Sequence, residues 1–260
     1  MPLTYSNYLK INELLSLQQP VSEGPEHDET LFIIIHQVYE LWFKEVIHEM
    51  DYLKRLLEKN NTPRAQHTLK RILTILKVMV AQLDILETMT PLDFLSFRDR
   101  LESGSGFQSY QFRVLEYLLG LKDARHLARF PAESIERKEL ELRYHQPCIW
   151  DSFLNYLSLN NYKIPKNMLE RDFTKSTQSS NEMQTILIDV YRNNPLILPI
   201  CERLIDLDEG FQEWRYRHVK MVQRTIGTKI GTGGSSGADY LMKTLFKPVF
   251  PDLWEIRTEL

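Results

Sequence analysis

Two histidines stand among apolar residues at helical spacing. His36 lies four residues after Phe32 and three before Tyr39, so these side chains share one helical face. His218 follows Trp214 by four residues, on the apolar stripe of another helical segment. A neutral imidazole can accept a hydrogen bond, take up a proton or bind a metal. Spacing alone favours a structural role for each, although two inward histidines on different helices of a bundle can also line a cofactor cavity.

Three further patterns could carry chemistry, and each has a structural alternative. Arg98 follows aromatic residues and could hold a carboxylate bidentately, or form an ordinary ion pair with Asp99. The Gly-rich run at 231–237 could bring backbone N–H groups and the Thr232 hydroxyl against a ligand, or serve as a flexible connector. Glu45 and His48 form a Glu-x-x-His unit of the di-iron type, but no second unit exists, so a solvated face is favoured.

Composition indicates an ordinary folded protein. The 260 residues are 26% charged and 43% hydrophobic, and the net charge of −3 gives no case for nucleic-acid binding. The sequence has no apolar run of about 18 residues and no N-terminal signal pattern, so no membrane association and a cytoplasmic location are expected. Cys148 and Cys201 are expected to be buried thiols, and no Cys-x-x-Cys-His motif for covalent haem is present.

Apolar residues recur at three- and four-residue intervals, and strand signals are almost absent, which predicts an all-α helical bundle. Long helices are expected at 30–59, with Asp28 as the cap, at 64–89, and at 195–226. Shorter helices are expected after Thr90 and at 107–119, the latter ending at Gly120. Residues 31–35 are apolar on every face, which predicts burial from several sides. Arg215 should point away from the stripe of His218. We expect one domain over residues 1–260, with a less regular, polar excursion around 121–184.

Taken in order along the chain, these motifs resemble the tryptophan 2,3-dioxygenase family, whose haem enzymes open the indole ring of L-tryptophan. The resemblance covers nearly the whole chain and is weakest between residues 121 and 184. It rests on these segments: Thr4-Tyr5-Ser6-Asn7-Tyr8-Leu9, His27-Asp28-Glu29 through Leu41-Trp42-Phe43-Lys44, Thr90-Pro91 through Arg98, Ser105-Gly106-Phe107-Gln108-Ser109, Trp214-Arg215 through His218, and the Gly-rich run 231–237.

The resemblance implies a cofactor and a role for each site residue. His218 would be the proximal ligand of a non-covalent b-type haem, with Ser105 and Gly106 also contacting the cofactor. His36 would be the distal histidine that hydrogen-bonds the indole N–H. The remaining substrate contacts would come from Phe32 against the indole, Phe94 and Arg98 at the carboxylate, Thr232 at the amino-acid group, and Tyr5, Tyr8 and Leu9 from a neighbouring subunit.

The implied reaction is cleavage of the indole C2–C3 bond with O₂, giving N-formyl-L-kynurenine in the kynurenine pathway of tryptophan catabolism. The implied assembly is a homotetramer, a dimer of dimers. Phe94 stands where some members have Tyr and cannot donate a hydroxyl hydrogen bond, a loss of about 1.5–3 kcal/mol at most. Three alternatives stay open: a related haem oxygenase that takes a substituted tryptophan or inserts one oxygen atom, a non-catalytic haem-binding helical sensor, and a di-iron carboxylate protein.

Overall fold

The computed structural model describes residues 2–24, 26–102, 104–229 and 241–260. Every regular element in these ranges is helical, which confirms the expected all-α class. The α-helices are α1 (Tyr5–Leu9), α2 (Ile11–Leu15), α3 (His27–Glu58), α4 (Thr62–Leu86), α5 (Pro91–Arg98), α6 (Tyr110–Leu118), α7 (Ile135–His145), α8 (Ile149–Leu159), α9 (Lys166–Leu169), α10 (Asn181–Asn193), α11 (Leu198–Ile226) and α13 (Pro251–Glu255). The 3-10 helices are η1 (Asp99–Leu101), η2 (Gly106–Gln108), η3 (Ala124–Arg129) and η4 (Ile256–Thr258).

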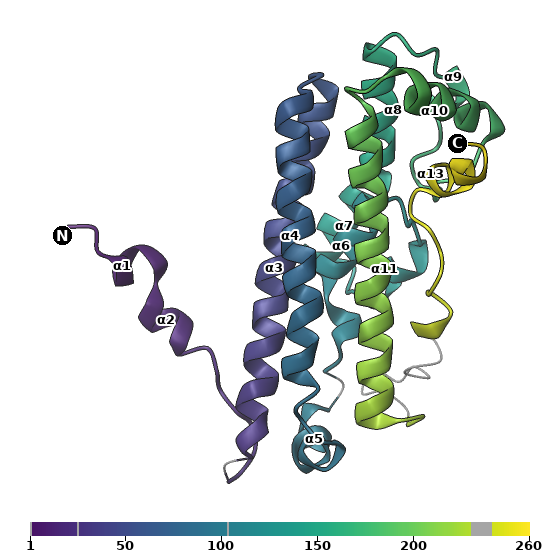
Figure 1. Cartoon of the computed structure of the whole chain (residues 1–260). Helices are drawn as coiled ribbons and strands as arrows, with labels where there is room; N and C mark the ends of the chain where they lie inside the picture. Colours follow the sequence, from purple (N-terminus) through teal and green to yellow (C-terminus); the bar gives the residue numbers. More distant parts are fainter. Residues whose placement is uncertain (1, 25, 103, 230–240) are drawn as a thin grey trace.

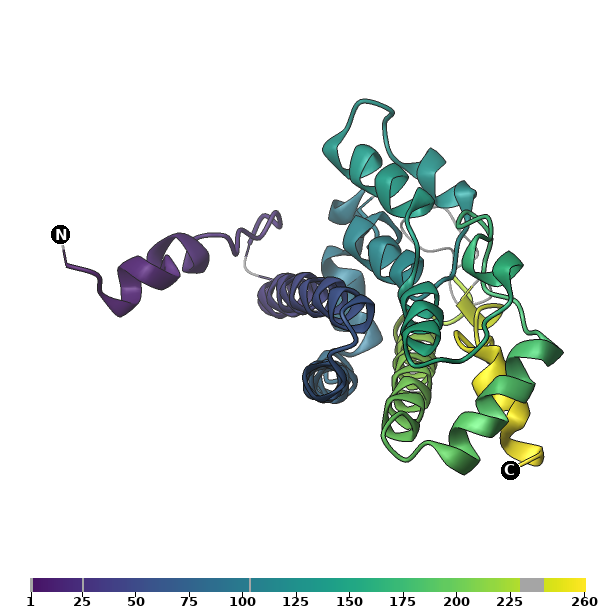
Figure 2. The same cartoon turned by 90° about the horizontal axis from the view of Figure 1, so that it is seen from above.

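Three long helices form the body of the bundle (Figure 1). Helix α4 packs between α3 and α11, and α6 and α8 cover another side of α3 (Figure 2). The short helix α5 contacts both α3 and α11. The two elements that carry the candidate histidines, α3 and α11, are therefore bridged by α4 and by α5.

The turn between α3 and α4 follows from its asparagines. Asn60 takes the left-handed conformation, with φ of 53°, just beyond the end of α3. Asn61 caps α4, where its side chain accepts a hydrogen bond from the Arg64 N–H at 3.3 Å. The expected ranges 30–59 and 64–89 thus become His27–Glu58 and Thr62–Leu86. The expectation that Asp28 caps α3 is wrong: Glu26 is the N-cap residue, and Asp28 lies in the first turn, where negative charge favours the helix dipole.

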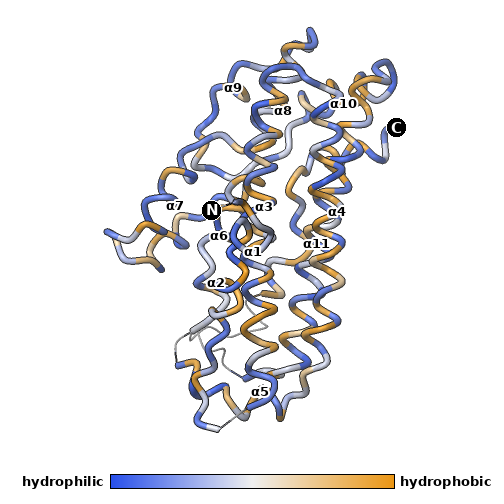
Figure 3. Tube along the Cα trace, turned by 90° about the vertical axis from the view of Figure 1, so that its left-hand side faces the viewer, coloured by the Kyte–Doolittle hydropathy of each residue, from blue (hydrophilic) through white to orange (hydrophobic). Residues whose placement is uncertain are grey.

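Helix α11 buries the predicted stripe. Leu207, Phe211, Trp214 and Met221 are all buried, and α11 begins at Leu198, three residues after the expected start at 195. In Figure 3, hydrophobic and hydrophilic residues alternate along the long helices. Residues 31–35 were expected to be buried from several sides, and in the single chain this prediction is wrong. Ile35 is buried, but Ile34 is 42% exposed.

The segment 121–184 is more regular than expected. It contains α7, α8 and α9, and α8 places Trp150, Phe153 and Tyr156 in the fully buried core. Helix α7 was not predicted, because its residues are mostly charged and among them only Leu140 is buried. The predicted stop at Gly120 is confirmed. Its φ is 91°, and a Cβ there would come within 2.7 Å of the Thr177 hydroxyl.

The N-terminal helices α1 and α2 project away from the bundle (Figures 1 and 2). Their apolar side chains are uncovered, with Tyr5 75% and Leu15 70% exposed. Cys148 and Cys201 are buried thiols, as expected. Among the residues that the structure describes, no helix combines the length and the apolar character that a membrane span requires.

Candidate active site

The ring of His36 is oriented by its own helix. Its Nδ1 lies 2.7 Å from the backbone carbonyl oxygen of Phe32, one turn earlier in α3. A carbonyl can only accept a hydrogen bond, so the neutral ring carries its proton on Nδ1. Burial lowers the pKa of His36, although the hydrogen bond to the Phe32 carbonyl opposes this shift. His36 is therefore neutral near pH 7 and presents the lone pair of Nε2 as an acceptor.

Aromatic rings from α3 and α5 form a wall beside His36. The centroid of the Phe32 ring lies 4.1 Å from that of His36, 5.7 Å from Phe94 and 5.5 Å from Phe97. Phe94 and Phe97 are buried. These faces suit a flat apolar ring next to a hydrogen-bond acceptor, the two features by which an indole is recognised.

Arg98 is the last residue of α5 and is half-buried. It follows Phe94 by four residues, so both side chains lie on the same face of the helix. The start of α5 is fixed by a reciprocal capping box between Thr90 and Asp93, with Pro91 in the first turn. The capped helix α5 thus sets Arg98 one turn after Phe94.

His218 lies on α11, where its ring stacks on Trp214 with centroids 5.2 Å apart and an interplanar angle of 5°. Burial, together with smaller effects of His36 and Arg113, lowers the pKa of His218 to about 4. The two histidines are therefore within electrostatic reach of each other. No hydrogen bond joins the His218 ring to any part of the chain that the structure describes. It is a neutral imidazole with an uncommitted nitrogen, the form that binds a metal.

The turn at Ser105 and Gly106 precedes α6 along the chain. The Ser105 hydroxyl accepts a hydrogen bond from the Phe107 N–H at 3.3 Å and so caps η2. A Cβ added at Gly106 would meet nothing within 4 Å, so open space adjoins this backbone. The guanidinium carbon of Arg113 lies 5.9 Å from the centroid of the Phe107 ring.

These features fit a haem group. The neutral imidazole of His218 could serve as an axial ligand, and the aromatic side chains of Trp214 and Phe112, 5.1 Å apart, supply apolar surface beside it. The di-iron alternative has no comparable support. Within the described ranges, no group of three or more His, Cys, Asp or Glu side chains is arranged to hold a metal ion. His48 is exposed, as the sequence analysis expected.

One group of expected site residues lies apart from these side chains, and another lies outside the residues that the structure describes. Tyr5, Tyr8 and Leu9 lie on the projecting helix α1, where they are 75%, 70% and 41% exposed. Thr232, together with the whole run 231–237, lies outside the residues that the structure describes.

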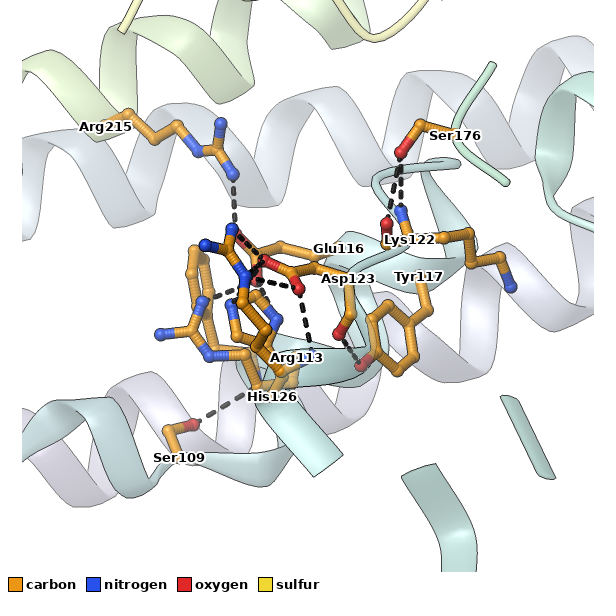
Figure 4. A network of polar contacts seen from close by, with 11 residues as sticks. Ser109, Arg113, Glu116, Tyr117, Lys122, Asp123, His126, Ser176 and Arg215 are labelled. Atoms are coloured by element: carbon orange, nitrogen blue, oxygen red, sulfur yellow. Dashed lines mark hydrogen bonds and ion pairs between the residues drawn. The ribbon is translucent and has the colours of Figure 1, made fainter. Parts of the chain in front are cut away.

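Sequence reasoning missed a buried ionic cluster beside His218. Arg215 points away from the apolar stripe, as expected, but the face it occupies is buried against α6. There it meets Glu116, which also binds Arg113 (Figure 4). The available signal was a pair of opposite charges, three residues apart, inside the otherwise apolar sequence of α6.

Comparisons with known proteins identify the family of the chain. The family described as tryptophan 2,3-dioxygenase matches residues 1–138 and 131–260. A curated protein of that name from Herpetosiphon aurantiacus is 64% identical over 99% of this chain and 98% of its own length. Proteins of the same name from an Anaeromyxobacter strain and from Myxococcus xanthus are 53% and 42% identical over 99% of this chain, covering 96% and 89% of their lengths. The chain therefore belongs to the tryptophan 2,3-dioxygenase family.

Proposed function

We propose that this chain is an enzyme, a haem-dependent dioxygenase that cleaves the indole C2–C3 bond of L-tryptophan with O₂ to give N-formyl-L-kynurenine. The observation that carries the proposal is the 64% identity to a curated tryptophan 2,3-dioxygenase over essentially the full length of both chains. The side chains support it, because the neutral acceptor His36 lies beside the rings of Phe32 and Phe94, and Arg98 follows Phe94 by one turn of α5.

The cofactor in this proposal is a b-type haem, held through His218 with contacts from Ser105 and Gly106. The sequence offers no Cys-x-x-Cys-His motif for covalent attachment, so retention of the haem would depend on His218 and on the side chains around the haem. When bound, the haem iron supplies the activation of O₂ that the side chains cannot provide.

The side chains bind and orient the substrate. His36 accepts a hydrogen bond from the indole N–H at Nε2, and Phe32, with Phe94 and Phe97 behind it, holds the plane of the ring. An indole N–H is a very weak acid, so His36 needs only to accept this bond and not to remove the proton. Fixing the ring in one orientation lowers the entropic part of the barrier.

The polar end of the substrate would be held separately. The Arg98 guanidinium binds the carboxylate as a fork, and Thr232 contacts the ammonium and carboxylate groups. Because Phe94 has no hydroxyl, Arg98 carries more of the carboxylate binding here than in relatives with a Tyr at this position.

The assembly in this proposal is a homotetramer in which Tyr5, Tyr8 and Leu9 complete the pocket of a neighbouring subunit. The uncovered apolar side chains support an oligomer. They lie on the projecting N-terminal helices and also on α3, where Ile34 is 42% and Leu41 is 53% exposed.

The experiment that tests this function compares the wild-type protein with His218→Ala after loading with haem. We expect the wild-type protein to bind haem with the optical spectrum of a histidine ligand and, once reduced, to convert L-tryptophan to N-formyl-L-kynurenine in air. His218→Ala should lose stable haem binding. Full haem retention and normal turnover by the variant would refute the ligand assignment. A haem-loaded wild-type protein without product would favour the sensor instead.

A further inference from the structure

The base of the N-terminal arm is tied to α3. The arm comprises residues 2–24, and its helices α1 and α2 project away from the bundle (Figures 1 and 2). Residues 17–22 form the base of the arm, and two side chains of α3 bind this base. Because the base is held while α1 and α2 project, the direction of these two helices depends on the contacts at the base.

Glu29 makes the first contact. Its Oε1 accepts a hydrogen bond from the Val21 N–H at 2.7 Å, and its Oε2 accepts one from the Ser22 N–H at 3.2 Å. Glu29 is 1% exposed, so the arm covers this carboxylate. Burial opposes ionisation of the carboxyl group, but the hydrogen bonds from Ser22 and Val21 and the charge of Arg100 lower its pKa. An ionised carboxylate therefore binds two consecutive backbone groups, and such bonds are stronger than neutral ones.

Gln37 makes the second contact, about two turns further along α3. Its Nε2 donates a hydrogen bond to the Leu17 carbonyl oxygen at 3.1 Å, and its Oε1 accepts one from Gln18 Nε2 at 2.6 Å. His36 precedes Gln37 directly and follows Glu29 by seven residues, which places His36 and Glu29 near one face of the helix. The arm is thus fixed to the stretch of α3 that carries the proposed substrate contacts.

The projecting helices carry apolar side chains that their own subunit leaves largely uncovered. Tyr5 and Tyr8 on α1 are 75% and 70% exposed, and Leu15 on α2 is 70% exposed. In the proposed assembly, α1 completes the pocket of a neighbouring subunit. An arm that already points toward its partner loses less conformational entropy on docking than a freely moving arm, so a fixed base would favour this exchange.

We propose that Glu29 is a positioning residue, which fixes the direction in which the arm leaves its own subunit. The apolar side chains of α1 are thereby presented to the pocket of a second copy of this chain. The inference rests on the assembly in the proposed function, and it deepens that proposal by naming the residue that directs the exchange. Glu29 acts on the site of the partner through the arm, without touching the substrate itself.

The test is a double-mutant cycle between Glu29→Gln and deletion of residues 1–9, measured as kcat/KM for L-tryptophan with the haem-loaded protein. Glu29→Gln keeps the size of the side chain but removes the charge and one acceptor oxygen. In the full chain we expect kcat/KM to fall about tenfold, the range of one charge-assisted hydrogen bond. In the chain without residues 1–9 the same substitution should change nothing further. An equal fall in both chains would show a direct effect on α3 and overturn the inference.

Amide hydrogen exchange provides a readout that does not depend on turnover. The N–H groups of Val21 and Ser22 should be protected in the wild-type protein and should exchange about tenfold faster in Glu29→Gln. Glu23→Gln is the matched control, because Glu23 is an exposed carboxylate in the same arm. Its exchange and its kcat/KM should stay at the wild-type values. Unchanged protection of both amides in Glu29→Gln would contradict the anchoring contact.

Two further measurements separate the role of Glu29 from the proposed reaction. If Glu29→Gln does not fold, Gln37→Ala removes the second contact, and the same cycle with the deletion applies. A wild-type protein that binds haem but does not convert L-tryptophan would refute the reaction. Subunit association, measured by analytical ultracentrifugation, then replaces kcat/KM in the cycle. Glu29→Gln should weaken association in the full chain and leave that of the truncated chain unchanged, and equal effects in both chains would overturn the role of Glu29.

Discussion

Among single residues, the role proposed for His36 rests on a hydrogen bond inside its own helix. The Phe32 carbonyl holds the Nδ1 proton, so Nε2 can only accept. Sequence spacing placed His36 and Phe32 on one face of α3, because helical periodicity fixes that relation. Spacing could not show the direction of the ring, since side-chain rotation and the partners in α5 depend on the tertiary fold.

An N-methylated indole tests this assignment. 1-Methyl-L-tryptophan has no indole N–H, so the wild-type protein should bind it about tenfold more weakly than L-tryptophan, the upper range for one neutral hydrogen bond. His36→Ala removes both the acceptor and the bulk of the ring, and should abolish this preference. Equilibrium binding to the haem-loaded protein measures both ratios. An unchanged preference in His36→Ala would contradict the hydrogen bond.

Acid should destabilise the protein through His126. Its pKa is about 4 in the folded state, because burial and the nearby Arg113 disfavour the charged ring, against 6.5 for the ordinary residue. A lowered folded-state pKa means that the unfolded chain binds the proton more readily, so stability is present above pH 6.5 and is lost as the pH falls toward 4. The full loss is about 3 kcal/mol.

Urea unfolding of the haem-free protein at several pH values measures this effect. The wild-type protein should lose stability between pH 6.5 and 4, and His126→Gln should remove about 3 kcal/mol of that dependence. His67, which lies on α4 outside the ionic cluster, provides the matched control as His67→Gln. A pH dependence in His126→Gln equal to that of the wild-type protein would refute the assignment.

At the scale of elements, Asp208 fixes the C-terminal segment to α11. Its Oδ2 accepts hydrogen bonds from the N–H groups of Val249 and Phe250 at 2.7 and 2.9 Å, and from Trp254 Nε1 at 2.9 Å. Asp208 is fully buried, so its removal leaves three donors without their acceptor.

Asp208→Ala should therefore reduce the free energy of unfolding by about 3 kcal/mol or more, while Asp206→Ala, at an exposed position of the same helix, should change it by less than about 0.5 kcal/mol. Denaturant unfolding gives the energies, and amide hydrogen exchange locates the loss at residues 249–254. Equal effects of the two substitutions would argue against this anchor.

Helices with strong periodicity were predictable and charged ones were not. Helix α4 was expected at 64–89 and lies at Thr62–Leu86, because an unbroken apolar stripe and Pro63 define it. Helix α7 was missed, since its residues are mostly charged and its burial depends on the neighbouring helix α6. The role of Arg215 was missed for the same reason: periodicity gives its face, but only the packed fold shows that this face is buried against Glu116.

At the scale of the whole molecule, the N-terminal helices contribute little to the bundle of their own chain. Among the described elements, helix α1 has its main contacts with α2 and none of comparable extent with the bundle. The apolar side chains of both helices are exposed. Deletion of residues 1–9 should therefore leave folding and haem content intact. In the proposed tetramer the same deletion removes Tyr5, Tyr8 and Leu9 from the pocket of a neighbouring subunit, so turnover should fall about tenfold or more.

Haem absorbance per chain and steady-state rates measure the two effects of this deletion. Substitution of Lys10 by Ala is the control, because this exposed residue lies just beyond the deleted segment. A full rate in the truncated protein would remove the case for completion of the pocket by another subunit.

In the proposed reaction both atoms of O₂ enter L-tryptophan, and the mass of the product formed under isotopically labelled O₂ shows whether they do. The reduced, haem-loaded protein should give N-formyl-L-kynurenine that carries two labelled oxygen atoms. A product with one labelled atom, or no product from L-tryptophan despite bound haem, would contradict the dioxygenase assignment.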